Sequence, residues 1–214
     1  MSAQEPWSER AELYRTSTAH SHGPDLDLVV EWADGCRTAI DVATGGGHVA
    51  RRLREAGLEV VSCDPAPGMA PDVICAAEEL PFADGSFDLG VTRVAAHHFA
   101  DPAAAVAELA RVAASRVVVV DTLYGGESLE RAERLRDPSH VRNYDEAQWR
   151  TFFSAAGLLV EEVQVFDHPI ELEPWFARTG CTGAEAAEAR ALLTGRIDGG
   201  FLALERIALR ARPG

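Results

Sequence analysis

The sequence of 214 residues lacks several features that define particular classes of protein. Its four cysteines, Cys36, Cys63, Cys75 and Cys181, form no C-x-x-C pair, so a zinc site is hard to build and free thiols are expected. No apolar run reaches the roughly 20 residues that span a bilayer. The N-terminal residues 1–15 lack the basic start and apolar core of a secretion signal. These absences predict a cytoplasmic protein with no metal site and no membrane insertion.

Positive charge is also scarce. The formal net charge is −14, and the acidic residues are spread along the chain rather than gathered in a tail. Binding to nucleic acid requires basic patches that displace counterions from the phosphates. We therefore expect no nucleic-acid partner. The length suits one domain over residues 1–214, and composition leaves the oligomeric state open, a homodimer included.

Short apolar runs alternate with helical patterns along the chain. Strand-like runs lie at residues 38–43, 58–64, 72–76, 86–94, 116–123, 158–166 and 201–211. The four valines at 117–120 indicate a strand buried on both faces, as in the middle of a parallel sheet. Helices are expected at 48–57, at 102–113 after Asp101 as N-cap, and at 146–157 after a capping box of Asp145 and Gln148. This order predicts a Rossmann-like, doubly wound α/β fold, with a seven-stranded, mostly parallel sheet and an antiparallel last strand.

Two further segments are expected to be helical. Residues 1–37 predict an N-terminal helix, which either covers a ligand as a lid or packs on the sheet edge. Residues 171–195 predict a small helical insertion before the last strand, with Thr182 and Glu185 as a second capping box. In doubly wound sheets ligands bind beyond the carboxyl ends of the strands. Here those ends hold residues 41–47, 64–69, 93–99 and 121–124.

A glycine-rich loop follows the first predicted strand. Its pattern, Gly45-x-Gly47-x-x-Ala50 with Asp64 about 20 residues later, fits the relaxed dinucleotide fingerprint, so an NAD(P)-dependent oxidoreductase is one interpretation. Asp41 favours another. A carboxylate four residues before the first glycine would repel a pyrophosphate, and it suits a ligand that carries an ammonium group and a sulfonium.

Several separate motifs resemble one family. DVATGGGHVA (41–50), VVSCDPAPGM (60–69) and AEELPFADGSFDLGVTRVAAHHFADP (77–102) resemble class I S-adenosylmethionine-dependent methyltransferases, and RDPSHVRNYDEAQWRTFFSAAGL (136–158) is similar to bacterial members. The nearest type is the ubiquinone/menaquinone-biosynthesis C-methyltransferase group, and the resemblance spans about residues 10 to 166. It implies transfer of a methyl group from S-adenosyl-L-methionine to O, N or C of a small molecule, with S-adenosyl-L-homocysteine as product. A non-enzymatic S-adenosylmethionine-binding protein is a further alternative.

The resemblance also implies roles for individual residues in binding the cofactor. Asp64 would accept hydrogen bonds from both ribose hydroxyls. Arg93 would line the cleft where the methyl group emerges. The amino-acid end would lie on Asp41, Ala43, Thr44, Gly45, Gly46 and Gly47, and the adenine between Pro65 and Met69 with its edge along Ala77 and Glu78.

The sequence departs from the family pattern at three places. Family members usually have an aspartate for the adenine amino group at the position of Ala76. The linker from Asp64 to Cys75 is short for a crossover helix, and residues 113–116 replace the usual Pro-Gly-Gly turn. Adenine recognition is therefore expected to use backbone groups or Glu78.

Methyl transfer is an in-line displacement, so a base is needed only when the acceptor must lose a proton. His97 and His98 follow the fourth predicted strand, and one of them is a candidate base; packing under Phe99 or capping a turn is the alternative. The candidates for the pocket of the methyl acceptor are Tyr14, Arg142 and Trp175. The alternative for Tyr14 is packing on the sheet edge, for Arg142 a position in a solvated loop, and for Trp175 a position in the core.

Overall fold

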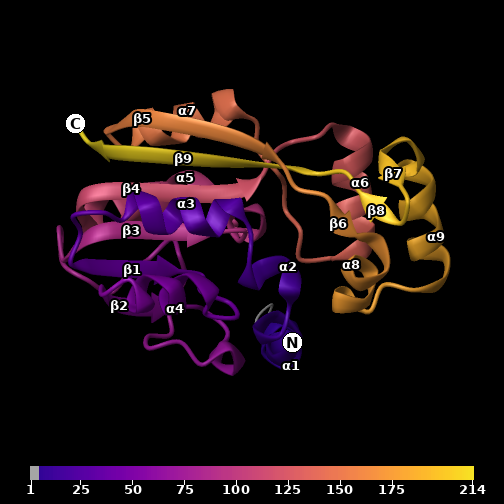
Figure 1. Ribbon diagram of the computed structural model, residues 1–214, viewed down its shortest axis with the longest axis horizontal. Helices are drawn as coiled ribbons and strands as arrows, with labels where there is room; N and C mark the ends of the chain where they lie inside the picture. Colours follow the sequence, from indigo (N-terminus) through magenta and orange to yellow (C-terminus); the bar gives the residue numbers. More distant parts are fainter. Residues whose placement is uncertain (1–4) are drawn as a thin grey trace.

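The computed structural model describes residues 5–214 and has a six-stranded sheet at its centre (Figure 1). The strand order is β2 (Glu59–Cys63), β1 (Thr38–Val42), β3 (Phe87–Arg93), β4 (Ala113–Thr122), β9 (Glu205–Pro213) and β5 (Leu158–Asp167). The first four strands pair in parallel, and β9 is antiparallel to both of its neighbours, β4 and β5. The predicted Rossmann-like fold with an antiparallel last strand is confirmed.

Helices cover both faces of this sheet. On one face, α3 (Pro24–Trp32) and α4 (His48–Glu55) pack against Val118 and Val120, and on the other, α5 (Pro102–Val112) and α7 (Glu146–Ala155) pack against Val117 and Val119. The four valines thus alternate between two cores, as predicted for a strand buried on both faces. The caps of α5 and α7 also form as predicted: the Asp101 side chain accepts from the Ala104 N–H, and Asp145 and Gln148 make a capping box.

The predicted third strand, residues 72–76, does not join the sheet as a strand. Among the described residues, the pairing there is a single bridge between Cys63 and Val73. The linker before it holds only a short 3₁₀ turn, η1 (Pro67–Met69), because too few residues separate Asp64 from Cys75 for a crossover helix. The sheet consequently has six strands rather than seven.

A second, smaller layer lies beyond the carboxyl ends of the strands (Figure 1). It contains α6 (Glu127–Arg136), which the sequence analysis did not predict, and α8 (Leu172–Thr179) and α9 (Gly183–Leu192), which form the predicted insertion. A small antiparallel sheet joins β6 (Ile170–Glu171), β8 (Phe201–Leu202) and β7 (Ile197–Asp198), so the predicted strand 201–211 is split, with β9 starting at Glu205. The Thr182–Glu185 capping box is wrong: Thr182 is the N-cap of α9, but its side chain makes no capping hydrogen bond.

The N-terminal helices, α1 (Glu5–Arg15) and α2 (Thr18–Ser21), lie across the same edge of the sheet (Figure 1). A Cβ on Gly68 would lie 2.5 Å from the Cα of Ser8, so α1 rests directly on the backbone of η1. Residues 1–4 of the predicted N-terminal lid lie outside the described residues. No helix from residue 5 onward is long and apolar enough to cross a membrane.

Candidate functional site

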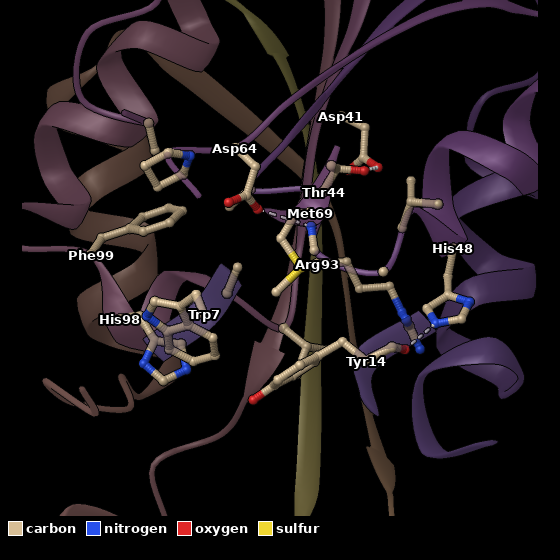
Figure 2. A pocket seen from close by; sticks show the side chains of 18 of the residues that line it. Trp7, Tyr14, Asp41, Thr44, His48, Asp64, Met69, Arg93, His98 and Phe99 are labelled. Carbon is tan, nitrogen blue, oxygen red and sulfur yellow. Dashed lines mark hydrogen bonds between the residues drawn. The ribbon is translucent and has the colours of Figure 1, made fainter. Parts of the chain in front are cut away.

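A pocket of about 380 Å³ lies where the carboxyl ends of β1, β2 and β3 meet α1 (Figure 2). Its size is that of a small-molecule or cofactor site. Many of the predicted site residues line it, contributed by three loops and the N-terminal helix: Tyr14, Asp41, Ala43, Thr44, Gly45, Gly46, Asp64, Pro65, Met69, Ala77, Glu78, Arg93 and His98.

The glycine loop is tied to the end of β2 by Asp64. The Gly45 N–H donates to Asp64 Oδ2 at 3.0 Å, and the Ala66 N–H donates to Oδ1 at 2.9 Å. Burial raises the pKa of the Asp64 carboxyl, and these two hydrogen bonds oppose the shift. A carboxylate oxygen has two lone pairs. Each oxygen of Asp64 can therefore still accept one hydrogen bond from a ligand in the pocket.

Asp41 sits on the pocket wall at the end of β1, and it also holds the glycine loop. Its Oδ2 accepts from the Thr44 hydroxyl at 2.5 Å and from the Ala50 N–H at 3.0 Å. Full burial raises the pKa of Asp41 to about 6. A cationic group bound beside this carboxylate would lower that pKa again, so the site favours a ligand with a positive charge at this position.

The helix α1 packs against the glycine loop at the wall of the pocket. The His48 Nε2–H donates to the backbone oxygen of Tyr14 at 2.9 Å, and Arg51 donates to His48 Nδ1 at 2.8 Å. A Cβ at Gly46 would lie 2.7 Å from the same Tyr14 oxygen. Gly46 therefore lets α1 approach the loop, in addition to any close approach of a ligand.

Only one of the two adjacent histidines, His98, lines this pocket. Its Nδ1 lies 3.1 Å from the backbone oxygen of Ser139 and 3.2 Å from the Ser139 hydroxyl, which itself donates to Asp137 at 2.6 Å. Both partners of Nδ1 act as acceptors, so Nδ1 carries the proton and Nε2 has a free lone pair. Burial, reinforced by the charge of His97, lowers the pKa of His98 to about 3, so the ring is neutral at physiological pH.

His97 instead forms a buried pair with Asp121 at the end of β4. Its Nδ1 lies 2.6 Å from Asp121 Oδ1, and its backbone N–H donates to Oδ2 at 2.9 Å. Burial alone lowers the pKa of His97, but the charge and hydrogen bond of Asp121 outweigh it and raise that pKa above its ordinary value. His97 thus fixes the turn after β3 that presents His98.

Besides His97, three predicted site residues do not line this pocket. Gly47 is the left-handed N-cap of α4, with φ of +74°. Arg142 lies over the ring of Tyr124, with its guanidinium carbon 5.5 Å from the ring centroid. Trp175 is buried in the helical insertion beneath the Arg136 guanidinium, as in the core alternative considered for it.

The pocket also includes His20, His48 and Phe99, which the sequence analysis did not assign to the site. His48 follows the glycine loop directly, and Phe99 follows His98, so their positions next to predicted site residues were the available signal. His20 reaches the pocket from α2, and no sequence pattern connects it to the strand ends.

At the far end of the pocket, Ala76 lines the wall where the family pattern has a carboxylate. Glu78 lies beside it, and one of its two carboxylate oxygens already has partners within the protein. Its Oε1 accepts hydrogen bonds from the N–H groups of Ala100 at 3.1 Å and Asp101 at 3.3 Å. Glu78 thereby joins this wall to the loop before α5.

Comparisons with known proteins agree on one family. Residues 40–120 match the family described as "Methyltransferase domain". The uncharacterized methyltransferase YcgJ of Bacillus subtilis is 34% identical over 206 residues, which cover 84% of this chain and 81% of that protein. The uncharacterized protein YafE of Escherichia coli is 39% identical over 109 residues, which cover 48% of this chain and 53% of that protein.

Solved structures give the same result. The crystal structure of YcgJ has a TM-score of 0.81 at 27% identity, and covers 90% of this chain and 99% of its own. A putative methyltransferase of Bacillus halodurans has a TM-score of 0.80 at 27% identity, with coverage of 90% and 100%. A geranyl diphosphate methyltransferase in complex with GPP and sinefungin, at 13% identity and a TM-score of 0.64, shares the fold alone.

The fold is that of the Rossmann-like α/β proteins, with a pocket at the carboxyl ends of its strands, and the comparisons make the class specific. The chain belongs to the class I S-adenosylmethionine-dependent methyltransferases. The comparisons support neither the oxidoreductase nor the non-enzymatic alternative. The ubiquinone/menaquinone subtype stays a prediction.

Proposed function

We propose that this pocket binds S-adenosyl-L-methionine and directs its methyl group to O, N or C of a small molecule bound beside His98. The observation that carries the proposal is the pair of carboxylates, Asp41 and Asp64, on adjacent strand ends around one glycine loop. Asp64 offers one acceptor site per oxygen to the two ribose hydroxyls, and Asp41 offers a negative charge to the ammonium group of the methionine moiety.

The remaining walls suit the other parts of the cofactor. Pro65, Met69 and Phe99 provide apolar surface for the faces of the adenine ring, and Ala77 and Glu78 line its edge. With Ala76 in place of a carboxylate, we propose that the adenine amino group donates to Glu78 Oε2 or to solvent at the exposed Ala76. A structural neighbour, a magnesium protoporphyrin IX methyltransferase with bound S-adenosylhomocysteine, at 16% identity and a TM-score of 0.58, supports this type of ligand for the fold.

The chemistry requires alignment more than acid–base catalysis. A bound S-adenosylmethionine supplies an electrophilic methyl group, and the protein must hold the acceptor atom in line with it and exclude water. His98 Nε2 can accept a hydrogen bond from an O–H or N–H group of the methyl acceptor. This hydrogen bond would orient the lone pair of that O or N atom toward the methyl group. Trp7 and Tyr14 of α1 close the site against solvent, with the Trp7 and His98 ring centroids 4.6 Å apart.

Mass spectrometry tests the proposal on the intact protein. The purified chain is incubated with S-adenosylmethionine labelled in the methyl group and with a panel of small phenols, amines, carboxylic acids and enols. We expect S-adenosylhomocysteine and a singly labelled product that depend on the protein. Absence of both across the panel, with S-adenosylmethionine still bound, would instead support the non-enzymatic alternative.

A further inference from the structure

A cluster of titratable side chains that contains three arginines adjoins the pocket on the side of the helical insertion. It consists of His20, Asp25, Arg93, His168, Arg178 and Arg206, which we call the arginine cluster. The residues come from α2, α3, the end of β3, the turn after β5, α8 and β9. Asp25 pairs with Arg93 and Arg206, and the charges of all three arginines act on His20 and His168, so six segments converge on the cluster. Arg93 and His20 also line the pocket, which joins the cluster to the proposed methyl-transfer site.

One carboxylate serves two guanidinium groups in this cluster. Arg93 Nε lies 2.7 Å from Asp25 Oδ2, and Arg206 Nη1 lies 2.6 Å from the same oxygen. Arg93 Nη1 also donates to the backbone oxygen of His20 at 2.9 Å. The third arginine, Arg178, forms no ion pair or hydrogen bond with any residue between 5 and 214.

Several donors in the cluster have no partner. Arg93 Nη2, Arg206 Nε and His168 Nε2 are buried without a hydrogen bond to any described residue, as is Asp25 Oδ1. Arg93 is only 8% exposed and Arg206 only 4%. Buried polar groups are normally paired, because an unpaired one loses its interactions with water. Unpaired donors on two buried arginines are therefore groups that an acceptor atom bound beside them would satisfy.

The charge of the cluster points to the same ligand chemistry. Burial and the neighbouring arginines lower the pKa of His20 and lower that of His168 to about 4, so both rings are neutral at physiological pH. Burial lowers the pKa of Arg206 to about 10, which leaves it charged. Two guanidinium cations thus share one carboxylate. Arg178 adds a third positive charge that acts on His20 and His168, in a chain whose net charge is −14.

We propose that the arginine cluster is an anion subsite that binds a carboxylate or phosphate group of the methyl acceptor. This rests on the proposed function of the adjoining pocket. The carboxylate of the cofactor's methionine is the other possible source of an anion. It is bonded to the carbon that bears the ammonium group and therefore belongs near Asp41 and Gly45. Arg178 and Arg206 extend the cluster away from that loop, to elements that do not line the cofactor pocket.

The test measures anion binding to the protein saturated with S-adenosylhomocysteine. Inorganic phosphate and benzoate serve as probes, titrated by calorimetry at constant ionic strength against sodium chloride. Arg178→Gln is the main variant, since it leaves the Asp25 pairs intact, and Arg206→Gln is the second. Arg150→Gln, on the exposed face of α7, is the matched control. Thermal unfolding of each variant reports its fold.

We expect at least one probe to bind the wild-type complex, and Arg178→Gln to weaken it about tenfold, the scale of a charge-assisted contact, while S-adenosylhomocysteine affinity stays within about twofold. No binding of either probe beyond the chloride control would overturn the proposal. So would an equal loss of S-adenosylhomocysteine affinity in Arg178→Gln, which would assign the anion to the cofactor. If the wild type does not bind S-adenosylhomocysteine, the proposed function fails. The anion subsite is then tested on the free protein, by the binding of the probes and by the loss of that binding in Arg178→Gln.

Discussion

Asp64 Oδ2 accepts a hydrogen bond from the Gly45 N–H at 3.0 Å, which joins the end of β2 to the glycine loop after β1. The same carboxylate is proposed to hold the ribose of the cofactor. Asp64→Ala should therefore weaken S-adenosylhomocysteine binding by roughly 1.5–3 kcal/mol, the scale of hydrogen bonds to a charged group. Calorimetry measures this change, with the exposed Asp198→Ala as control. Unchanged affinity in Asp64→Ala would remove the ribose assignment.

A second prediction concerns the adenine end of the pocket. Ala76 lines the pocket and is exposed, so a longer side chain has room there. Ala76→Asp should provide an acceptor for the adenine amino group and tighten S-adenosylhomocysteine binding by roughly 0.5–1.5 kcal/mol, the net value of one hydrogen bond. The exposed neighbour Glu79→Asp is the control. Weaker binding in Ala76→Asp would show that the adenine does not lie against this wall.

The buried pair of His97 and Asp121 should make stability depend on pH. The folded-state pKa of His97 is raised, so its contribution is complete below the unfolded value of 6.5 and is lost as pH rises through the folded value. Burial raises the pKa of Asp121, but the charge and hydrogen bond of His97 outweigh it and leave that pKa below 3.8, so its contribution is lost only at lower pH. The pair therefore stabilises most between about pH 4 and 6.5.

Asp121→Asn should consequently lower the free energy of unfolding by roughly 3 kcal/mol or more near pH 6 and by less near pH 9, because removing the carboxylate leaves the charged His97 buried without a partner. Urea unfolding at several pH values measures the difference between wild type and variant. A difference that does not change between pH 6 and 9 would mean that His97 is neutral in the folded protein throughout this range.

His98 should be a neutral ring with its proton on Nδ1. The Ser139 oxygens face Nδ1, and burial, with the charge of His97, lowers the pKa of His98 to about 3. ¹⁵N NMR of the histidine rings should show the Nδ1–H tautomer for His98 and no titration between pH 5 and 9. His98→Gln identifies the signal. A titration near pH 6.5, or a proton on Nε2, would contradict the proposed orientation of the acceptor.

Much of the fold was predictable because its elements are locally encoded. The valines at 117–120, the Asp101 cap and the Asp145–Gln148 box each specify an element from adjacent residues, and each formed as predicted. The strand at 72–76 failed because pairing depends on the length of the preceding linker, which leaves room for a bridge only. The Thr182 cap failed although its residue types fit a capping box, because its side chain makes no hydrogen bond with the helix.

The residues that share the pocket were predictable where they lie on strand ends. Asp41, Gly45, Asp64 and Arg93 are placed together by the topology alone. The positions of Arg142 and Trp175 were not predictable in this way, because they depend on how α6 and the helical insertion pack. The arginine cluster draws on six distant segments, and its partial pairing is visible only once they are brought together.

The central claim, that the glycine loop holds S-adenosylmethionine, is tested most directly by calorimetry of the purified chain with S-adenosylhomocysteine and with NAD. We predict saturable binding of S-adenosylhomocysteine at one site per chain, abolished or weakened in Asp64→Ala, and no binding of NAD. Saturable binding of NAD with no response to S-adenosylhomocysteine would contradict the account.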